Sequence, residues 1–180
     1  MGHAPHLLVG DLDSISPAAL QALAAAGCQV VRHRPDKEET DAELALLAAR
    51  ARGATHITLL GATGGRIDHE LANVQLLAMP QLQGIHVAIY DGLSWLWLAE
   101  GLAEIRGAVG DLVSLIPWGG DVEDIVTEGL RYPLRHEALA LGPARGVSNL
   151  LTQPLARVTW ARGRLLIVHT PRIHLEAAHG

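Results

Sequence analysis

Three times in the first seventy residues, an apolar run ends and carboxylates or glycines follow where the next helix is expected to begin. The segments are Asp11-Leu12-Asp13-Ser14, Thr40-Asp41 and Gly64-Gly65-Arg66-Ile67-Asp68. In a chain that alternates strands and helices, such turns lie at the carboxyl edge of one sheet and share one crevice. Carboxylates there, beside a glycine pair and an arginine, suit a divalent metal that holds a polyphosphate. The pattern therefore predicts an enzyme.

The first half of the chain alternates between strand and helix patterns. Ser16-Pro17 is a typical helix start, and Thr40 with Glu43 has the spacing of a capping box. Strands separated by helices of this length indicate βαβ units and a parallel sheet. We expect strands at 6–10, 28–34, 56–60 and 85–90, and helices at 17–26, 41–52 and 66–79.

After residue 92 the pattern changes to short apolar runs with glycine-rich turns between them. We see no helical pattern of useful length here and predict an all-β sandwich or partial barrel, with a hairpin turn at 161–164. The fold class is therefore α/β: a parallel-sheet α/β catalytic domain at 1–92, followed by an all-β sandwich domain at 93–180.

The composition excludes several other classes of protein. Hydrophobic residues make up 49% of the 180 residues and charged residues 18%, which is typical of a globular chain. A net charge of -5 without a basic patch argues against nucleic-acid binding, and no apolar stretch is long enough for a membrane span. Because residues 1–5 lack a secretion signal and Cys28 is the only cysteine, we expect a cytoplasmic protein.

Two stretches carry the charged groups. Asp11 and Asp13 place two carboxylates on one tight turn, where both can hold Mg²⁺; the alternative is that Asp13 or Ser14 caps the next helix. Further along, Asp41 can add a carboxylate and Lys37 can neutralise a phosphate. A solvated loop before a capped helix explains this second stretch equally well.

The segment 61–69 is the most specific local signal. Gly64 and Gly65 lie between a strand and a helix, where their backbone N–H groups can approach an anion. Arg66 adds a guanidinium group, which can donate hydrogen bonds to phosphate oxygens. The spacing matches neither a P-loop nor a dinucleotide fingerprint. Asn73 either points towards the same crevice or is an exposed polar residue.

Together these residues resemble the thiamine pyrophosphokinase (thiamine diphosphokinase) family. The resemblance implies a transferase that moves a diphosphate from ATP to the hydroxyl of thiamine, giving thiamine diphosphate and AMP. It also implies Mg²⁺ and a homodimer with its active site at the subunit interface. The family motifs stand here in order as Gly10-Asp11-Leu12-Asp13-Ser14-Ile15, Lys37-Glu38-Glu39-Thr40-Asp41, Gly64-Gly65-Arg66-Ile67-Asp68-His69-Glu70-Leu71-Ala72-Asn73 and Gly146-Val147-Ser148-Asn149.

The resemblance also implies roles for individual residues. Thiamine would contact Ser148 and Asn149, and Asp68 would orient or deprotonate the hydroxyl. The Mg²⁺ ligands would be Asp11, Asp13 and Asp41. These three aspartates and Asp68 would together be the catalytic residues. The residues expected to contact ATP and its phosphates are Ser14, Lys37, Thr40, Gly64, Gly65, Arg66 and Asn73.

Two departures from the family pattern are expected to matter. The usual first strand–helix units, with one further carboxylate, do not precede Gly10 in this sequence, and residues 150–154 offer no aromatic to stack on thiamine. Trp118 or Trp160 could take that place. Two alternatives stay open: a catalytically impaired dimer that binds thiamine or nucleotide, and a haloacid-dehalogenase-like phosphatase that uses the D-x-D turn.

Overall fold

The computed structural model describes residues 4–174. Residues 1–3, part of the stretch that was considered for a secretion signal, lie outside this range. The chain divides into two compact units, which are described separately: Met1–Ile57 with Pro80–Ile85, and Thr58–Met79 with His86–Gly180. The boundary expected near residue 92 stays a prediction.

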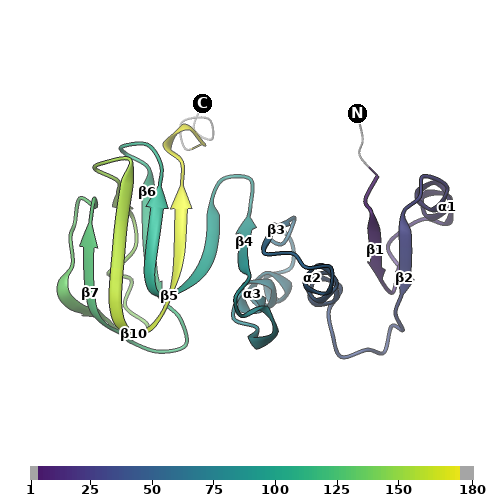
Figure 1. Cartoon of the computed structure of the whole chain (residues 1–180), viewed down its shortest axis with the longest axis horizontal. Helices are drawn as coiled ribbons and strands as arrows, with labels where there is room; N and C mark the ends of the chain where they lie inside the picture. The colour runs from purple at the N-terminus through teal and green to yellow at the C-terminus, as the bar shows by residue number, and fades with distance from the viewer. Residues whose placement is uncertain (1–3, 175–180) are drawn as a thin grey trace. The chain divides into compact units, whose positions relative to one another are not determined.

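The first unit contains a parallel pair of strands joined by a helix. Strand β1 (Leu7–Gly10) pairs in parallel with β2 (Gln29–Arg32), and α1 (Pro17–Ala25) connects them. Figure 1 shows α1 beside these two strands. Two parallel strands with a helical crossover form the predicted βαβ unit.

Both helices of this unit begin at the predicted residues. The hydroxyl of Ser16 accepts a hydrogen bond from the N–H of Ala19 and caps α1. Thr40 does the same with the N–H of Glu43 at the start of α2 (Asp41–Ala51). These caps satisfy N–H groups that have no partner inside the helix.

Helix α2 contributes to the apolar packing of this unit. It packs against β1 and against the 3-10 helix η1 (Pro80–Leu82). Leu46 of α2 and Leu82 of η1 are 1% and 3% exposed. Cys28 is buried as well, as expected of a small hydrophobic residue.

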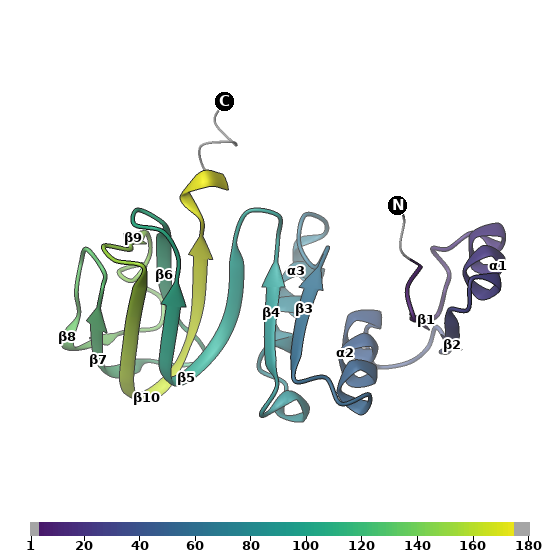
Figure 2. The same ribbon diagram turned by 45° about the horizontal axis from the view of Figure 1, so that its top comes forward.

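The second unit is built on one mixed sheet of eight strands, seen most clearly in Figure 2. The order is β3-β4-β5-β10-β6-β9, and β7 pairs with β10 and β8. Helix α3 (Ile67–Leu76) follows β3 in the sequence. The strands are β3 (His56–Leu60), β4 (His86–Tyr90), β5 (Trp95–Arg106), β6 (Leu112–Pro117), β7 (Val122–Glu128), β8 (Arg135–Leu139), β9 (Asn149–Leu150) and β10 (Leu155–Thr170).

The strand order refines the predicted fold class. The parallel pairing of β1 with β2 supports an α/β description of the first half. Strand β4 pairs antiparallel with β5, so one sheet contains strands from both predicted domains. A separate all-β sandwich therefore stays a prediction.

The predicted hairpin turn at 161–164 is wrong, because β10 runs through this segment as one strand of 16 residues. The strand pairs with β5 on both sides of a register shift, which marks a β-bulge. The indole N–H of Trp160 donates to the carbonyl oxygen of Gly163 at 3.0 Å. A Cβ on Gly163 would lie 2.5 Å from the carbonyl oxygen of Asp121, so a glycine is needed at this bend.

The apolar core of the second unit is formed by buried side chains of these strands and of the segments between them. Burial alternates along β6, where Val113 and Leu115 are buried and their neighbours are only partly so. Within residues 4–174, no helix is both long enough and apolar enough to cross a membrane. The buried core residues are Ala103, Ile105, Val113, Leu115, Val122, Ile125, Leu130, Leu134, Leu139, Leu151, Ala156, Val158, Trp160, Leu165 and Ile167.

Candidate active site

The turn after β1 carries two of the predicted metal ligands. Leu12 has a left-handed backbone (φ 64°), which is uncommon for a residue other than glycine. Within this turn the N–H of Asp13 donates to Oδ1 of Asp11 at 3.2 Å. Because Ser16 caps α1, helix capping does not explain Asp13 or Ser14, and both of these residues are exposed.

Lys37 lies between two of the predicted carboxylates. Its Nζ is 2.7 Å from Oδ1 of Asp41 and 3.7 Å from Oδ2 of Asp11, and the Lys37 side chain is only 11% exposed. The hydrogen bond to Asp41 raises the pKa of Lys37. The N–H of Asp13, together with the Lys37 charge, lowers the pKa of Asp11 although burial opposes this. The loop thus brings together three of the charged groups that the sequence singled out.

Asp11 and Asp41 are arranged to hold a cation, since both carboxylates face the same ammonium group. Proteins commonly hold Mg²⁺ with one or two carboxylates and complete its shell with water and phosphate oxygens. In the described part of the chain, no three metal-ligating side chains converge. The residues present therefore fit a site with two carboxylates, to which Asp13 does not add a third in this structure.

The glycine pair after β3 donates hydrogen bonds to a side chain of the following helix. Oε1 of Glu70 accepts from the N–H of Gly64 at 2.8 Å and from the N–H of Gly65 at 2.7 Å. Gly64 has a φ of 93°, which residues with a side chain rarely adopt. Both amides point at one oxygen, which is the geometry of an anion site.

Arg66 is paired with Asp68. Its Nε and Nη2 donate to the two carboxylate oxygens at 3.1 and 2.5 Å. These hydrogen bonds lower the pKa of Asp68 and raise that of Arg66. A carboxylate with a lowered pKa is a weaker base, so the arrangement suits Asp68 for orienting a hydroxyl better than for deprotonating it.

Asn73 and Thr40 each support the backbone of their own unit. Nδ2 of Asn73 donates to the carbonyl oxygen of Ala62 at 2.8 Å and so ties α3 to the loop before the glycine pair. Asn73 is therefore not a freely exposed polar residue. The hydroxyl of Thr40 is engaged by the N–H of Glu43, as described for α2.

Ser148 and Asn149 differ sharply in their surroundings. Asn149 is 9% exposed, and its Oδ1 accepts from the N–H groups of Tyr132 and Leu150 at 3.0 and 2.9 Å. Its Nδ2 donates to the carbonyl oxygen of Tyr132 at 2.8 Å. Ser148 is exposed, with a φ of 61°, and its N–H donates to Oγ of Ser114. Asn149 thus holds the backbone of Tyr132, a residue that the sequence analysis did not single out.

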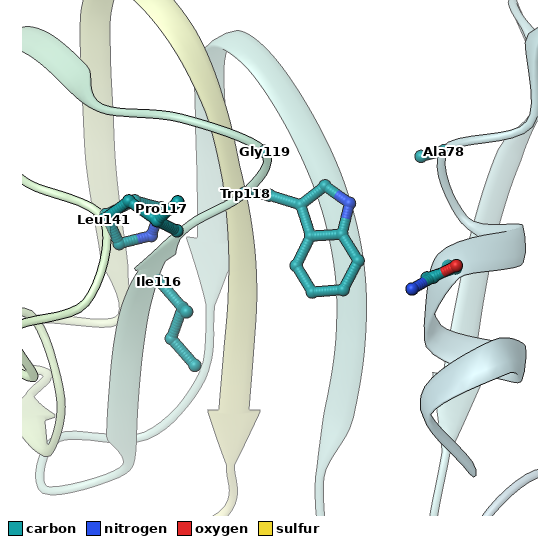
Figure 3. A pocket seen from close by; sticks show the side chains of 7 residues that line it. Ala78, Ile116, Pro117, Trp118, Gly119 and Leu141 are labelled. Atoms are coloured by element: carbon teal, nitrogen blue, oxygen red, sulfur yellow. The ribbon is translucent and has the colours of Figure 1, made fainter. Parts of the chain in front are cut away.

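Three adjoining hollows lie along β6. One of about 150 Å³ is lined by Tyr132 and Asn149, and a neighbouring one of about 160 Å³ shares Leu115, Gly146 and Val147 with it. The third, of about 580 Å³, shares Ile116, Pro117 and Leu141 with the second and is also lined by Gln75, Ala78, Trp118 and Gly119. Figure 3 shows the Trp118 indole in this third hollow, between Ile116 and Ala78.

Of the two tryptophans considered for stacking on thiamine, only Trp118 is accessible. Trp160 is 6% exposed, belongs to the apolar core and donates its indole N–H to Gly163. The expectation that Trp160 could serve is therefore wrong. Trp118 is partly exposed and lines the largest of the three hollows.

Two family profiles match the chain in succession. The profile described as "Thiamin pyrophosphokinase, catalytic domain" matches residues 1–89, and "Thiamin pyrophosphokinase, vitamin B1 binding domain" matches residues 103–165. Both matches agree with the motifs quoted from the sequence.

Individual relatives match most of the chain. The thiamine pyrophosphokinase of Bacillus subtilis (strain 168) is 28% identical over 163 residues, covering 89% of this chain and 76% of the relative. Thiamine pyrophosphokinase 1 of Oryza sativa subsp. japonica is 26% identical over 170 residues, and the match covers 88% of this chain and 64% of the rice protein. The crystal structure of the Bacillus subtilis thiamine pyrophosphokinase is similar with a TM-score of 0.83 at 27% identity, over 93% of this chain and 79% of that one.

Proposed function

The chain belongs to the thiamine pyrophosphokinase family, and from this premise we propose that it transfers a diphosphate from ATP to thiamine. The observation that carries the proposal is the succession of a catalytic-domain match and a vitamin B1-binding match in one chain. The thiamine hydroxyl oxygen forms a bond to the β-phosphorus, and the bond from that phosphorus to the oxygen bridging the α-phosphorus breaks. AMP leaves with the bridging oxygen, and the hydroxyl proton passes to a base or to water.

The cluster around Lys37 supports the charge chemistry of this reaction. Asp11 and Asp41 would hold Mg²⁺, with the exposed Asp13 as the third proposed ligand. When bound, Mg²⁺ neutralises phosphate charge and polarises phosphoryl oxygens. Lys37 brings a further positive charge that can pair with a phosphate oxygen. Ser14 and Thr40 remain proposed ATP contacts.

The glycine–arginine segment supplies donors for phosphate oxygens. Phosphoryl transfer depends mainly on positioning and on charge neutralisation, which the amides of Gly64 and Gly65 and the guanidinium of Arg66 can provide. Asp68 would orient the attacking hydroxyl. Asn73 would keep the loop in place through its bond to Ala62.

For thiamine we propose Ser148 as a direct contact and Asn149 as a residue that acts through the backbone of Tyr132. The thiazolium ring of thiamine carries a positive charge, and the face of an indole such as that of Trp118 attracts cations. We also propose that the chain works as a cytoplasmic homodimer with its active site at the subunit interface. Light scattering of the purified protein would test the dimer.

The decisive experiment is AMP release from ATP and Mg²⁺ with and without thiamine. Asp11→Asn should lower thiamine-dependent AMP release by about 100-fold or more, because it removes a charge from the cation site. The matched control is Asp36→Asn, which removes an exposed carboxylate that pairs with Arg34 outside this cluster. The control should keep the activity.

Three other outcomes would contradict the proposed function or the role of Asp11. Folded protein that binds thiamine without releasing AMP would support the catalytically impaired binding dimer instead. An aspartyl phosphate trapped during turnover would support the dehalogenase-like phosphatase. Equal loss of activity in both variants would reject the assigned role of Asp11.

A further inference from the structure

The Glu70 carboxylate lies on the two amides that are proposed to bind phosphate. A single oxygen, Oε1, accepts from both Gly64 and Gly65, at 2.8 and 2.7 Å. Glu70 belongs to the first turns of α3 and reaches back past the helix start to the preceding loop. An anion therefore already sits at the point where these two N–H groups converge, and the chain itself provides it.

The neighbouring donor is engaged in the same way. Arg66 directs two of its nitrogens at the carboxylate of Asp68, so the segment's guanidinium and its two glycine amides all donate to carboxylates of α3. Asp68 has a proposed role towards thiamine, whereas nothing in the proposed reaction uses Glu70. Its contact with the glycine amides needs a separate explanation.

We propose that Glu70 is an affinity-determining residue: its carboxylate takes the position of a nucleotide phosphate oxygen on Gly64 and Gly65 and must leave when a polyphosphate binds. The inference rests on the proposed function, because the site is the phosphate site assigned there. An N–H group makes one strong hydrogen bond at a time. A phosphate oxygen can therefore bind these amides only by replacing the Glu70 carboxylate. The displaced carboxylate stays on the same helix, where its charge opposes the incoming phosphate.

Two effects of removing Glu70 oppose each other, and the structure favours one of them. Loss of the carboxylate removes a competitor for the amides, but it also removes a contact that orders the loop. The loop keeps an independent anchor, because Nδ2 of Asn73 still donates to the carbonyl oxygen of Ala62. We therefore expect competition to outweigh ordering, so that replacing Glu70 strengthens phosphate binding.

The test is calorimetric titration of the full chain with inorganic pyrophosphate and with ATP. Glu70→Gln removes the charge while keeping an acceptor, and Glu70→Ala removes both. We expect the pyrophosphate Kd to fall by about tenfold in Glu70→Ala at low salt, with a smaller decrease in Glu70→Gln. Glu100→Gln, which removes the same charge from an exposed position on β5, should leave the Kd unchanged.

A second readout separates this role from a general effect on structure. In steady-state assays the KM for ATP should fall in both Glu70 variants, while the KM for thiamine stays constant. The amide resonances of Gly64 and Gly65 should shift on Glu70→Ala and again when pyrophosphate is added. Unchanged or weaker pyrophosphate binding in folded variants would overturn the proposal. If the unmodified chain released no AMP, the proposed function would be rejected. The role of Glu70 would still be tested, because pyrophosphate binding is measured without turnover.

Discussion

Asp41 lies so close to Gly10 that a Cβ at residue 10 would be 2.6 Å from its Oδ2. Gly10 also has a φ of 146°, which residues with a side chain rarely adopt. The last residue of β1 thus leaves space for the first residue of α2, whose carboxylate pairs with Lys37. The absence of a side chain at Gly10 therefore allows the Asp41 carboxylate to lie beside Lys37.

Gly10→Ala should displace Asp41 and abolish most of the thiamine-dependent AMP release, with a loss of stability of roughly 1–3 kcal/mol. The matched control is Gly53→Ala. Gly53 has a positive φ of 82° but no atom within 4 Å of an added Cβ, so this variant introduces backbone strain alone. If both variants lost stability and activity to the same extent, the close approach to Asp41 would have no special importance.

Asn149→Asp should destabilise the second unit by roughly 1–3 kcal/mol, as measured by urea unfolding at pH 7. The substitution replaces the Nδ2 donor with an oxygen that faces the carbonyl oxygen of Tyr132 in a buried position. Part of the stability should return at a pH low enough to protonate the new carboxyl group, because the protonated group can donate again. A variant as stable as the unmodified chain at pH 7 would contradict the role assigned to Asn149.

Trp118→Ala should raise the thiamine Kd by roughly tenfold, whereas Trp118→Phe should raise it less because a smaller aromatic face remains. Titration with thiamine in the absence of ATP measures this effect without turnover. The ATP affinity serves as the internal reference and should stay constant. Equal thiamine affinity in all three proteins would remove Trp118 from the proposed thiamine site.

The buried pair of Asp111 and His169 should make the protein sensitive to acid. Burial alone would raise the pKa of Asp111, but hydrogen bonds from the N–H of Arg172, from His169 and from the N–H of Ala108 outweigh it and hold the pKa below its ordinary value. A carboxyl group with a lowered pKa in the folded state contributes stability above its unfolded pKa of about 3.9. That stability is lost as the pH falls through the folded value.

Asp111→Asn should therefore be less stable than the unmodified chain at pH 7, and its stability should depend less on pH below about 4. Urea unfolding at several pH values measures both effects. Asp36→Asn provides the control, since Asp36 is exposed and pairs with the exposed Arg34. Parallel pH profiles for Asp111→Asn and the unmodified chain would exclude Asp111 as the source of acid sensitivity.

Local patterns predicted the elements of the first half well. The caps at Ser16 and Thr40 are short-range features, because each hydroxyl bonds an N–H three residues further on. The positions of β1, β3 and β4 follow from apolar runs that end at glycine or charged residues. The grouping of Asp11 and Asp41 around Lys37 also agrees with the expected cluster.

Contacts that depend on distant partners were not predictable in this way. A glycine at residue 163 suits a hairpin turn as well as a bulge, and only the pairing of β10 with β5 on both sides of the bend decides between them. Asn149 bonds Tyr132 seventeen residues away, and no local pattern identifies that partner. No local pattern identifies Glu70 as a partner of Gly64 and Gly65, because that contact depends on how the loop folds back.

Strand β10 also has a consequence for the synthesis of the protein. It pairs with β5, β6 and β7, so each of these strands keeps an unpaired edge until β10 has been made. The ribosome produces the chain from its N-terminus, and β10 is the last described strand to emerge. For that interval the growing chain exposes open strand edges, which favour pairing with other chains.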